Sequence, residues 1–200
     1  YNTSGLSINC GIYQLNTTEK ITYVTSLENN ISKRSPENLG SSNANGIEIN
    51  GKLDISKIIV MTSDFNLNRF NRRGIWGSQN FNFSGTRWSS EFRSKIKFPK
   101  DLDIELTLNY LSEYKTVDGE RGPSRNINFG VRKKIVDGRG VINLMVRDIF
   151  RTRVSESRAI RSNFIVNNWS TSGTFFSLGF SYGFGKGEAM EYQSKGGRRR

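Results

Sequence analysis

The stretch DIELTLNY at residues 103–110 decides the fold class of this 200-residue chain. Its apolar side chains alternate one by one with its polar side chains: Ile104, Leu106, Leu108 and Tyr110 against Asp103, Glu105, Thr107 and Asn109. Successive side chains of a β-strand point to opposite faces of the sheet. The stretch therefore predicts a strand with one apolar and one polar face.

The same alternation recurs on both sides of this stretch. Its clearest repeats are Leu178, Phe180, Tyr182 and Phe184 against Ser177, Gly179, Ser181 and Gly183, and Ile127, Phe129, Val131 and Ile135 against Asn126, Asn128, Gly130, Arg132 and Lys134, with Lys133 interrupting the apolar set. Others run through residues 46–55 and 61–68, and further strand signals fall at residues 5–15, 19–28, 80–98 and 140–152. We expect roughly eight strands, with a bulge near Gly85 where the alternation changes phase.

The expected connections alternate between short and long. Short turns are predicted at residues 16–19, 56–57, 99–102 and 137–140, and longer polar loops at residues 29–45, 71–79, 112–125 and 153–158 or beyond. Asp118-Gly119 and Asp137-Gly138 are dipeptides typical of tight hairpins. Short turns at one end and long loops at the other characterise an antiparallel barrel of the bacterial outer membrane. We therefore predict an all-β meander that forms a transmembrane β-barrel wall over residues 1–184, followed by a basic, Gly-rich tail at residues 185–200.

In such a barrel the two strand faces meet different surroundings. The residues expected to face lipid are Ile104, Leu106, Leu108, Tyr110, Leu178 and Phe180. Those expected to face the lumen are Asp103, Glu105, Asn109, Arg132 and Lys134. Trp76, Trp88, Trp169 and Phe98 lie near predicted strand ends, where aromatic girdles mark the bilayer interfaces.

Composition excludes a helical membrane protein and a disordered chain. Only 34% of residues are hydrophobic, the mean hydropathy is -0.56, and no stretch approaches the roughly 18 apolar residues of a membrane helix. The 3 Trp, 7 Tyr and 13 Phe far exceed the aromatic content of disordered segments. The chain starts at Tyr1 without a signal segment, so we expect a mature fragment of a longer protein.

The chain offers little for catalysis or metal binding. It has no His, which excludes a Ser-His-Asp triad, and its lone Cys10 allows neither an internal disulfide nor a zinc site. Asp103 and Glu105 share a strand face, but a wet lumen wall carries such carboxylates routinely. We expect no enzyme, no cofactor and no metal, with Cys10 as a small apolar residue of the wall.

The formal charge of +12 raises the question of an anionic partner. The basic residues spread over the polar strand face, the loops and the tail, without a compact aromatic platform for nucleic acid. We expect no nucleic-acid partner but contact with outer-membrane lipid and lipopolysaccharide. Two interpretations of the basic lumen stay open: simple solvation, or a selective site for an anionic ligand.

The sequence also resembles a known family. The stretch VRKKIVDGRGVINLMVRDIF at residues 131–150 and the closing FSLGFSYGF at residues 176–184 are similar to the last strands of outer-membrane β-barrel proteins related to TonB-dependent receptors, especially those of Bacteroidetes. Weaker similarity extends over nearly the whole chain. The resemblance implies the C-terminal part of a larger barrel, which would take up an unidentified ligand.

The resemblance further implies two protein partners. The barrel-assembly machinery would recognise the last strand through Ser177, Gly179, Tyr182 and Phe184, and TonB would be contacted through an N-terminal region that this sequence lacks. Gly183, where relatives often carry Arg, and the tail beyond Phe184 depart from the pattern. Two alternatives remain: a complete eight-stranded structural or adhesive barrel, and a soluble basic β-domain that binds nucleic acid.

Overall fold

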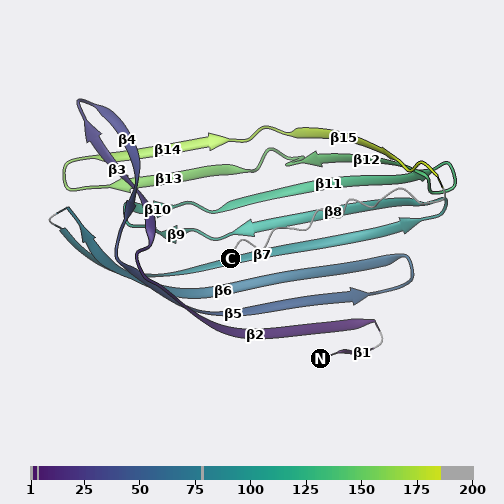
Figure 1. Ribbon diagram of the computed structural model, residues 1–200, viewed down its shortest axis with the longest axis horizontal. Helices are drawn as coiled ribbons and strands as arrows, with labels where there is room; N and C mark the ends of the chain where they lie inside the picture. The colour runs from purple at the N-terminus through teal and green to yellow at the C-terminus, as the bar shows by residue number, and fades with distance from the viewer. Residues whose placement is uncertain (1, 4, 78, 186–200) are drawn as a thin grey trace.

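The computed structural model describes residues 2–3, 5–77 and 79–185 of the chain, and over these residues the fold is all-β and antiparallel. Its main element is an open nine-stranded sheet (Figure 1), in the order β1-β2-β5-β6-β7-β8-β11-β12-β15. We call its eight long strands the wall: β2 (Leu6–Thr17), β5 (Ser41–Asp54), β6 (Ile59–Trp76), β7 (Gln79–Phe98), β8 (Leu102–Leu111), β11 (Ser124–Ile135), β12 (Gly140–Arg147) and β15 (Phe175–Tyr182). The short β1 (Asn2–Thr3) pairs with β2.

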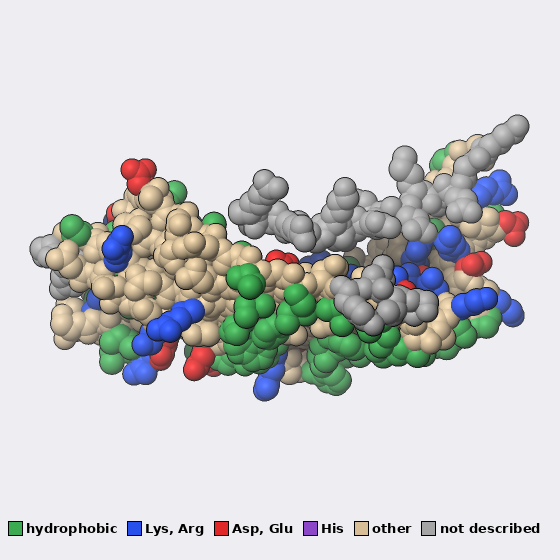
Figure 2. Space-filling model, turned by 90° about the horizontal axis from the view of Figure 1, so that it is seen from below, with side chains coloured by type: hydrophobic (Ala, Val, Ile, Leu, Met, Phe, Trp, Pro, Cys, Tyr) green, Lys and Arg blue, Asp and Glu red, His purple; other side chains and the backbone are tan. Residues whose placement is uncertain are grey.

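The registers place the alternating apolar side chains of all eight wall strands on one face. Leu106 lies opposite Phe129, for example, and Leu144 lies opposite Leu178. One row of register partners that crosses all eight wall strands consists of Leu6, Leu53, Met61, Ser94, Leu106, Phe129, Val146 and Phe176. Figure 2 shows hydrophobic side chains gathered along one side of the half of the sheet that carries the short turns. We call this side the apolar face, and the other the polar face.

The wall is a single layer, so its apolar face has no protein packed on it within the described residues. Leu178 is 75% exposed and Phe180 64% exposed. The buried hydrophobic residues of the described chain, Val24, Leu39, Phe70, Val141 and Ala159, are few for its size. A continuous exposed apolar face of this extent in water would drive association, so it requires apolar surroundings.

The short turns predicted for one end of the wall are present, but only one of the two predicted hairpin dipeptides occupies the centre of a turn. Short turns join β5 to β6, β7 to β8 and β11 to β12 at one end. In the last of these, the Arg139 N–H donates to the carbonyl of Val136 at 3.0 Å, and Asp137 and Gly138 both have positive φ. This confirms the predicted Asp137-Gly138 hairpin. The Asp118-Gly119 dipeptide, by contrast, is not at the centre of its turn. Between β9 and β10 the central residues are Val117 and Asp118, and Gly119 pairs with Thr116.

At the opposite end the predicted loops are themselves strands. Residues 29–45 contain β4 (Ile31–Asn38), residues 112–125 contain β9 (Tyr114–Lys115) and β10 (Gly119–Arg121), and β13 (Val154–Ile160) and β14 (Ile165–Thr171) follow the wall strand β12. β14-β13-β10-β9 form a separate four-stranded sheet. Polar side chains suggested loops here, but backbone pairing does not require an apolar face.

The prediction that residues 19–28 form a wall strand after a short turn at residues 16–19 was wrong. β3 (Ile21–Glu28) is not a wall strand, because it pairs with β4 in a two-stranded hairpin outside the wall, and β2 pairs directly with β5. The expected short turn at residues 16–19 is instead the start of this long excursion. Alternation at Ile21, Tyr23, Thr25 and Leu27 identified a strand correctly, yet it carries no information on which sheet the strand joins.

The bulge expected near Gly85 is also absent. The β6–β7 register runs without interruption from Ile59↔Ile96 to Trp76↔Gln79. Phe81 and Phe83 therefore lie on the polar face, opposite in sense to Trp88. Gly85 serves another purpose: a Cβ there would stand 2.6 Å from the Phe70 ring, so glycine is needed to make room for that ring.

Candidate functional site: the polar face of the wall and its cap

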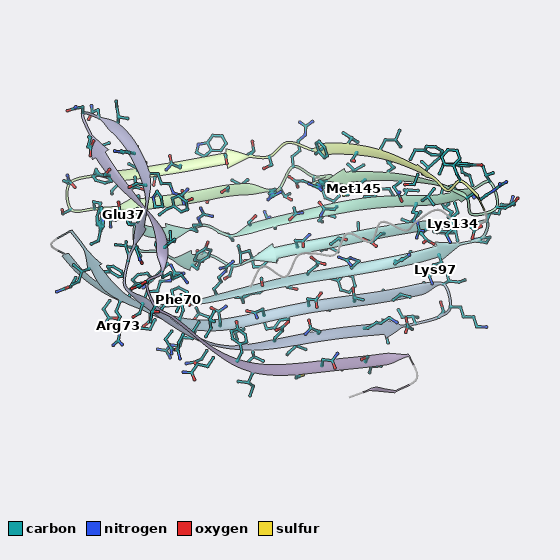
Figure 3. The ribbon with its side chains drawn as sticks, viewed as in Figure 1. Glu37, Phe70, Arg73, Lys97, Lys134 and Met145 are labelled. Atoms are coloured by element: carbon teal, nitrogen blue, oxygen red, sulfur yellow. The ribbon has the colours of Figure 1, made fainter. Side chains whose placement is uncertain are left out.

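The polar face begins, at the short-turn end, with a layer of paired charges. All five residues predicted to face the lumen lie on this face: Asp103, Glu105 and Asn109 of β8 and Arg132 and Lys134 of β11. Lys95 pairs with Asp103 at 2.9 Å, and Arg93 pairs with Glu105 at 3.4 Å and with Glu91 at 2.7 Å. Figure 3 shows Lys97 and Lys134 at this end of the sheet. These pairs are partly exposed, so each contributes little stability.

The middle of the polar face is a layer of amides and carboxylates. The Tyr13 hydroxyl donates to Asn66 Oδ1 at 3.0 Å, and Asn126 Nδ2 donates to Asn128 Oδ1 at 3.0 Å. This layer lines the bottom of an open hollow of about 620 Å³. The polar residues lining the hollow include Glu48, Asn50, Asp64, Glu91, Asn109, Arg147 and Arg153. The arrangement offers many hydrogen-bond donors and acceptors to a polar ligand or to another protein segment.

An aromatic layer follows, farther from the short turns. Phe70 is 5% exposed and packs edge-on against Phe83, with ring centroids 6.2 Å apart. The Arg72 guanidinium lies 5.1 Å from the centre of the Phe70 ring. On the apolar face of the same strand, Arg69, Asn71 and Arg73 follow Leu67, so the apolar belt ends at Leu67. The aromatic layer therefore lies beyond the belt.

Above this layer the excursions form what we call the cap: the β3–β4 hairpin, the β14-β13-β10-β9 sheet and the end of the β6–β7 hairpin (Figure 1). Asp118 joins all three. Its carboxylate, in a residue only 9% exposed, accepts a 3.0 Å hydrogen bond from Thr25 of β3 and an ion-paired bond from Arg161. Arg161 in turn lies 4.3 Å from the centre of the Trp76 ring at the end of β6. The cap is thus an ordered structure and not a set of independent loops.

Asp148 fixes the chain where it leaves the wall for the cap. It is 2% exposed and its carboxylate accepts hydrogen bonds from the backbone N–H groups of Thr152 at 2.9 Å and Arg153 at 3.0 Å. This local turn ends β12 at Arg147, whereas a strand through residue 152 was predicted. An aspartate that bonds the backbone a few residues on is a common turn-forming device.

The residues predicted to face lipid all lie on the apolar face: Ile104, Leu106, Leu108 and Tyr110 of β8, and Leu178 and Phe180 of β15. Cys10 lies on the same face, opposite Ile49. Lys133 also lies there, at the short-turn end, where its ammonium donates to the Lys100 carbonyl. A lysine at the edge of an apolar belt can place its ammonium among polar groups while its methylene stem lies against the apolar surface.

Two of the four predicted girdle aromatics lie elsewhere. Trp88 and Phe98 are on the apolar face near its two limits, and Trp88 stacks on Tyr110 with centroids 4.4 Å apart. Trp76 lies on the other face of β6, under Arg161, and Trp169 belongs to β14 of the cap. Both tryptophans are near strand ends, but Trp76 is in the part of β6 beyond the apolar belt and Trp169 is in a cap strand.

The four residues of the predicted assembly signal stand in or next to the last wall strand. Ser177 and Gly179 lie on the polar face, and the Tyr182 and Phe184 rings contact each other edge-on at 5.0 Å. A Cβ on Gly179 would meet Asn143 at an ordinary 3.9 Å, so no close approach of neighbouring atoms requires glycine at this position. The tail beyond Gly185 lies outside the described residues.

Sequence reasoning missed the cap residues Thr25, Asp118, Asp148 and Arg161. Asp118 and Arg161 are 43 residues apart, and no spacing rule connects them. Among the described residues there is no cluster of His, Cys, Asp and Glu suited to a metal ion, and no helix with the length and apolarity to cross a membrane.

An antiparallel wall with one apolar and one polar face, short turns at one end and ordered excursions at the other defines the class of outer-membrane β-barrel walls. The chain belongs to the outer membrane protein beta-barrel family, whose model matches residues 1–182. This places the protein in the outer membrane. No curated protein and no solved structure was found that matches the chain.

Proposed function

We propose that this chain is the C-terminal part of the wall of a larger, TonB-dependent-type receptor that takes up a ligand through the outer membrane. The observation that carries the proposal is the open sheet. In the described residues, the outer edge of β15 has no partner strand and that of β2 pairs only with the two-residue β1.

An open edge inside lipid is unfavourable because each unpaired backbone group there costs several kcal/mol. β2 has 12 residues and β15 has 8, so many such groups need partners. Further strands of a longer chain would supply them. Closing the eight strands on themselves would instead pair β2 with β15, which are the opposite edges of this sheet.

The polar face supports uptake over a purely structural role. Its hollow and its hydrogen-bonding middle layer suit a lumen that holds a ligand or a plug segment, whereas a complete eight-stranded barrel fills its interior with side chains. We also propose that the chain has no enzymatic activity, needs no cofactor and binds no nucleic acid. The absence of His from the sequence and the ion pairs that Arg93 and Lys95 form with lumenal carboxylates support this.

The size of the barrel is tested by comparing residues 1–184 with the full-length protein after refolding in detergent. A closed outer-membrane barrel resists SDS at room temperature and shifts its gel mobility on heating. We expect the shift for the full-length protein only. A heat-modifiable species formed by residues 1–184 alone would favour the complete small barrel.

The receptor role is tested in cells that express the full-length protein. We expect it to cross-link to TonB through photoreactive residues placed in its N-terminal region. A protein that reaches the outer membrane yet never cross-links to TonB would contradict the receptor part of the proposal, while leaving the barrel part intact.

A further inference from the structure

Several cationic side chains of the described polar face and cap have acidic partners. Arg93 and Lys95 pair with carboxylates of β7 and β8, and Arg158 and Arg161 pair with Glu120 and Asp118 of the cap. Three cations between the wall and the cap depart from this pattern: Lys20, Arg72 and Arg87. None of them forms an ion pair with an acidic residue of the described chain.

The fold brings these three residues into one region between the wall and the cap, where Lys20 is electrostatically coupled to both arginines. Arg72 of β6 and Arg87 of β7 both lie on the polar face, just beyond the apolar belt. Lys20 is the residue before the β3–β4 hairpin, and its N–H and carbonyl bond Gly40 and Leu39 at 3.1 and 2.9 Å. Gly40 in turn touches β6, since a Cβ on Gly74 would stand 2.8 Å from Gly40 Cα. The hairpin base is thereby held against the strand that carries Arg72 (Figure 3, near the labelled Phe70 and Arg73).

Aromatic rings orient the two guanidinium groups. Arg72 lies 5.1 Å from the Phe70 ring centre, and Arg87 lies 4.7 Å from the Tyr114 ring centre. A guanidinium stacked on a ring keeps its in-plane N–H donors available at its edge. Arg72 Nε is buried and has no hydrogen-bond partner in the described residues. A buried donor without a partner is costly unless a ligand supplies the acceptor.

Burial and nearby positive charge at Lys20 and Arg72 favour the binding of an anion. Burial lowers the pKa of Lys20, and the charges of Arg72 and Arg87 lower it further. Burial also lowers the pKa of Arg72, while Tyr114 acts in the opposite direction and Arg87 lowers it again. Positive charges that are held together and partly removed from water destabilise one another, and a bound anion relieves both effects.

We propose that Lys20, Arg72 and Arg87 form a binding site for an oxyanion group, phosphate or sulfate, carried by the ligand that enters the lumen. Arginine donates paired N–H groups that match the geometry of such oxyanions. The inference rests on the proposed function and deepens it, because the oxyanion belongs to the ligand that the receptor takes up. It assigns no role to Arg69, which lies on the other face of β6 and is exposed.

The test uses the full-length protein in detergent free of lipopolysaccharide, with inorganic phosphate and pyrophosphate as the probes in calorimetric titrations. We expect saturable binding that Arg72→Gln weakens about tenfold or more, because the substitution removes charge-assisted hydrogen bonds to the oxyanion. Lys20→Gln should weaken it similarly, and Arg72→Lys by less. Arg69→Gln is the matched control and should leave binding unchanged.

The outcomes separate the sources of the oxyanion and the two proposals. Binding that appears only when lipopolysaccharide is added, and that Arg69→Gln weakens as much as Arg72→Gln, would place the anion on the outer rim and overturn the site. Equal binding by the wild type and a Lys20→Gln, Arg72→Gln double variant would overturn it as well. Heat-modifiable mobility of each variant reports barrel formation independently, so a failed fold is not mistaken for a failed site.

Discussion

Whether a side chain of the wall lies on the apolar or the polar face depends on whether its position in the strand is odd or even. Leu106 and Thr107 are neighbours in β8, yet Leu106 lies beside Phe129 on the apolar face and Thr107 beside Asn128 on the polar face. The belt on β8 runs from Leu102 to Tyr110, so Leu106 stands near its middle. If the apolar face meets lipid, these two positions should respond oppositely to a charge.

We predict that Leu106→Arg destabilises the folded barrel by roughly 2 to 4 kcal/mol, the cost of arginine near the bilayer midplane on the lipid side. Thr107→Arg, the control one residue away, should change stability far less because its side chain would reach lumenal water. Equilibrium unfolding of the full-length protein in vesicles measures both. Equal costs for the two variants would contradict the assignment of faces.

Asp118 shows how much one residue organises the cap. It accepts bonds from β3 and from Arg161, and these elements are otherwise joined by few polar contacts among the described residues. Replacing it by Asn keeps a neutral acceptor for Thr25 but removes the charge that Arg161 requires. A buried cation then loses its partner, at a cost of about 1 to 3 kcal/mol.

We predict that Asp118→Asn loosens the β3–β4 hairpin without unfolding the wall. Trypsin should then cleave after Lys33 or Arg34 of β4 about tenfold faster than in the wild type, since 1.4 kcal/mol changes an opening equilibrium tenfold. Glu120→Gln, which breaks an exposed pair with Arg158, is the matched control and should change the rate little. Unchanged cleavage in Asp118→Asn would show that Asp118 does not hold the hairpin.

At the level of strands, the sequence predicted the wall well because period-2 alternation directly reflects a two-faced strand. The segments 46–55, 103–110 and 126–135 all became wall strands in the expected sense. Partner choice was not predictable: residues 19–28 alternate as well as a wall strand does, but they pair with β4. The cap could not be foreseen either, because its strands are short, polar and held by contacts such as Asp118 to Arg161 that are distant in sequence.

The lengths of β6 and β7 separate membrane from cap. A tilted membrane strand needs about 9 to 11 residues, and the apolar belt of β6, from Ile59 to Leu67, fits that length. β6 has 18 residues and β7 has 20. Their remaining residues extend beyond the belt, where Phe70, Phe81 and Phe83 pack together on the polar face below the cap.

The last wall strand gives a prediction at the same scale. We propose that the segment 177–184 governs assembly, because it presents the terminal edge of the wall and ends in the Tyr182–Phe184 ring pair. Replacing Tyr182 and Phe184 by Ser in the full-length protein should sharply lower its amount in isolated outer membranes. Deleting residues 187–200 should not. The reverse result would assign targeting to the tail.

The molecule as a whole is a single layer with two surfaces of opposite character, an arrangement that is unstable in water alone. None of the described residues packs against its apolar face, and its polar face carries charges and amides that lipid would not solvate. A membrane that borders a water-filled lumen satisfies both faces at once. Membership of the outer membrane protein beta-barrel family agrees with this reading of the wall.

The most direct test of the two-faced wall is cysteine labelling of the full-length protein in intact outer membranes, with Cys10 replaced by Ala. Single cysteines are introduced at Leu106, Leu108 and Phe180 on the apolar face, and at Glu105, Thr107 and Ser181 on the polar face. A small membrane-impermeant maleimide should label the polar-face set, and should label the apolar-face set only after detergent or denaturant is added. Equal labelling of the two sets in intact membranes would contradict the account.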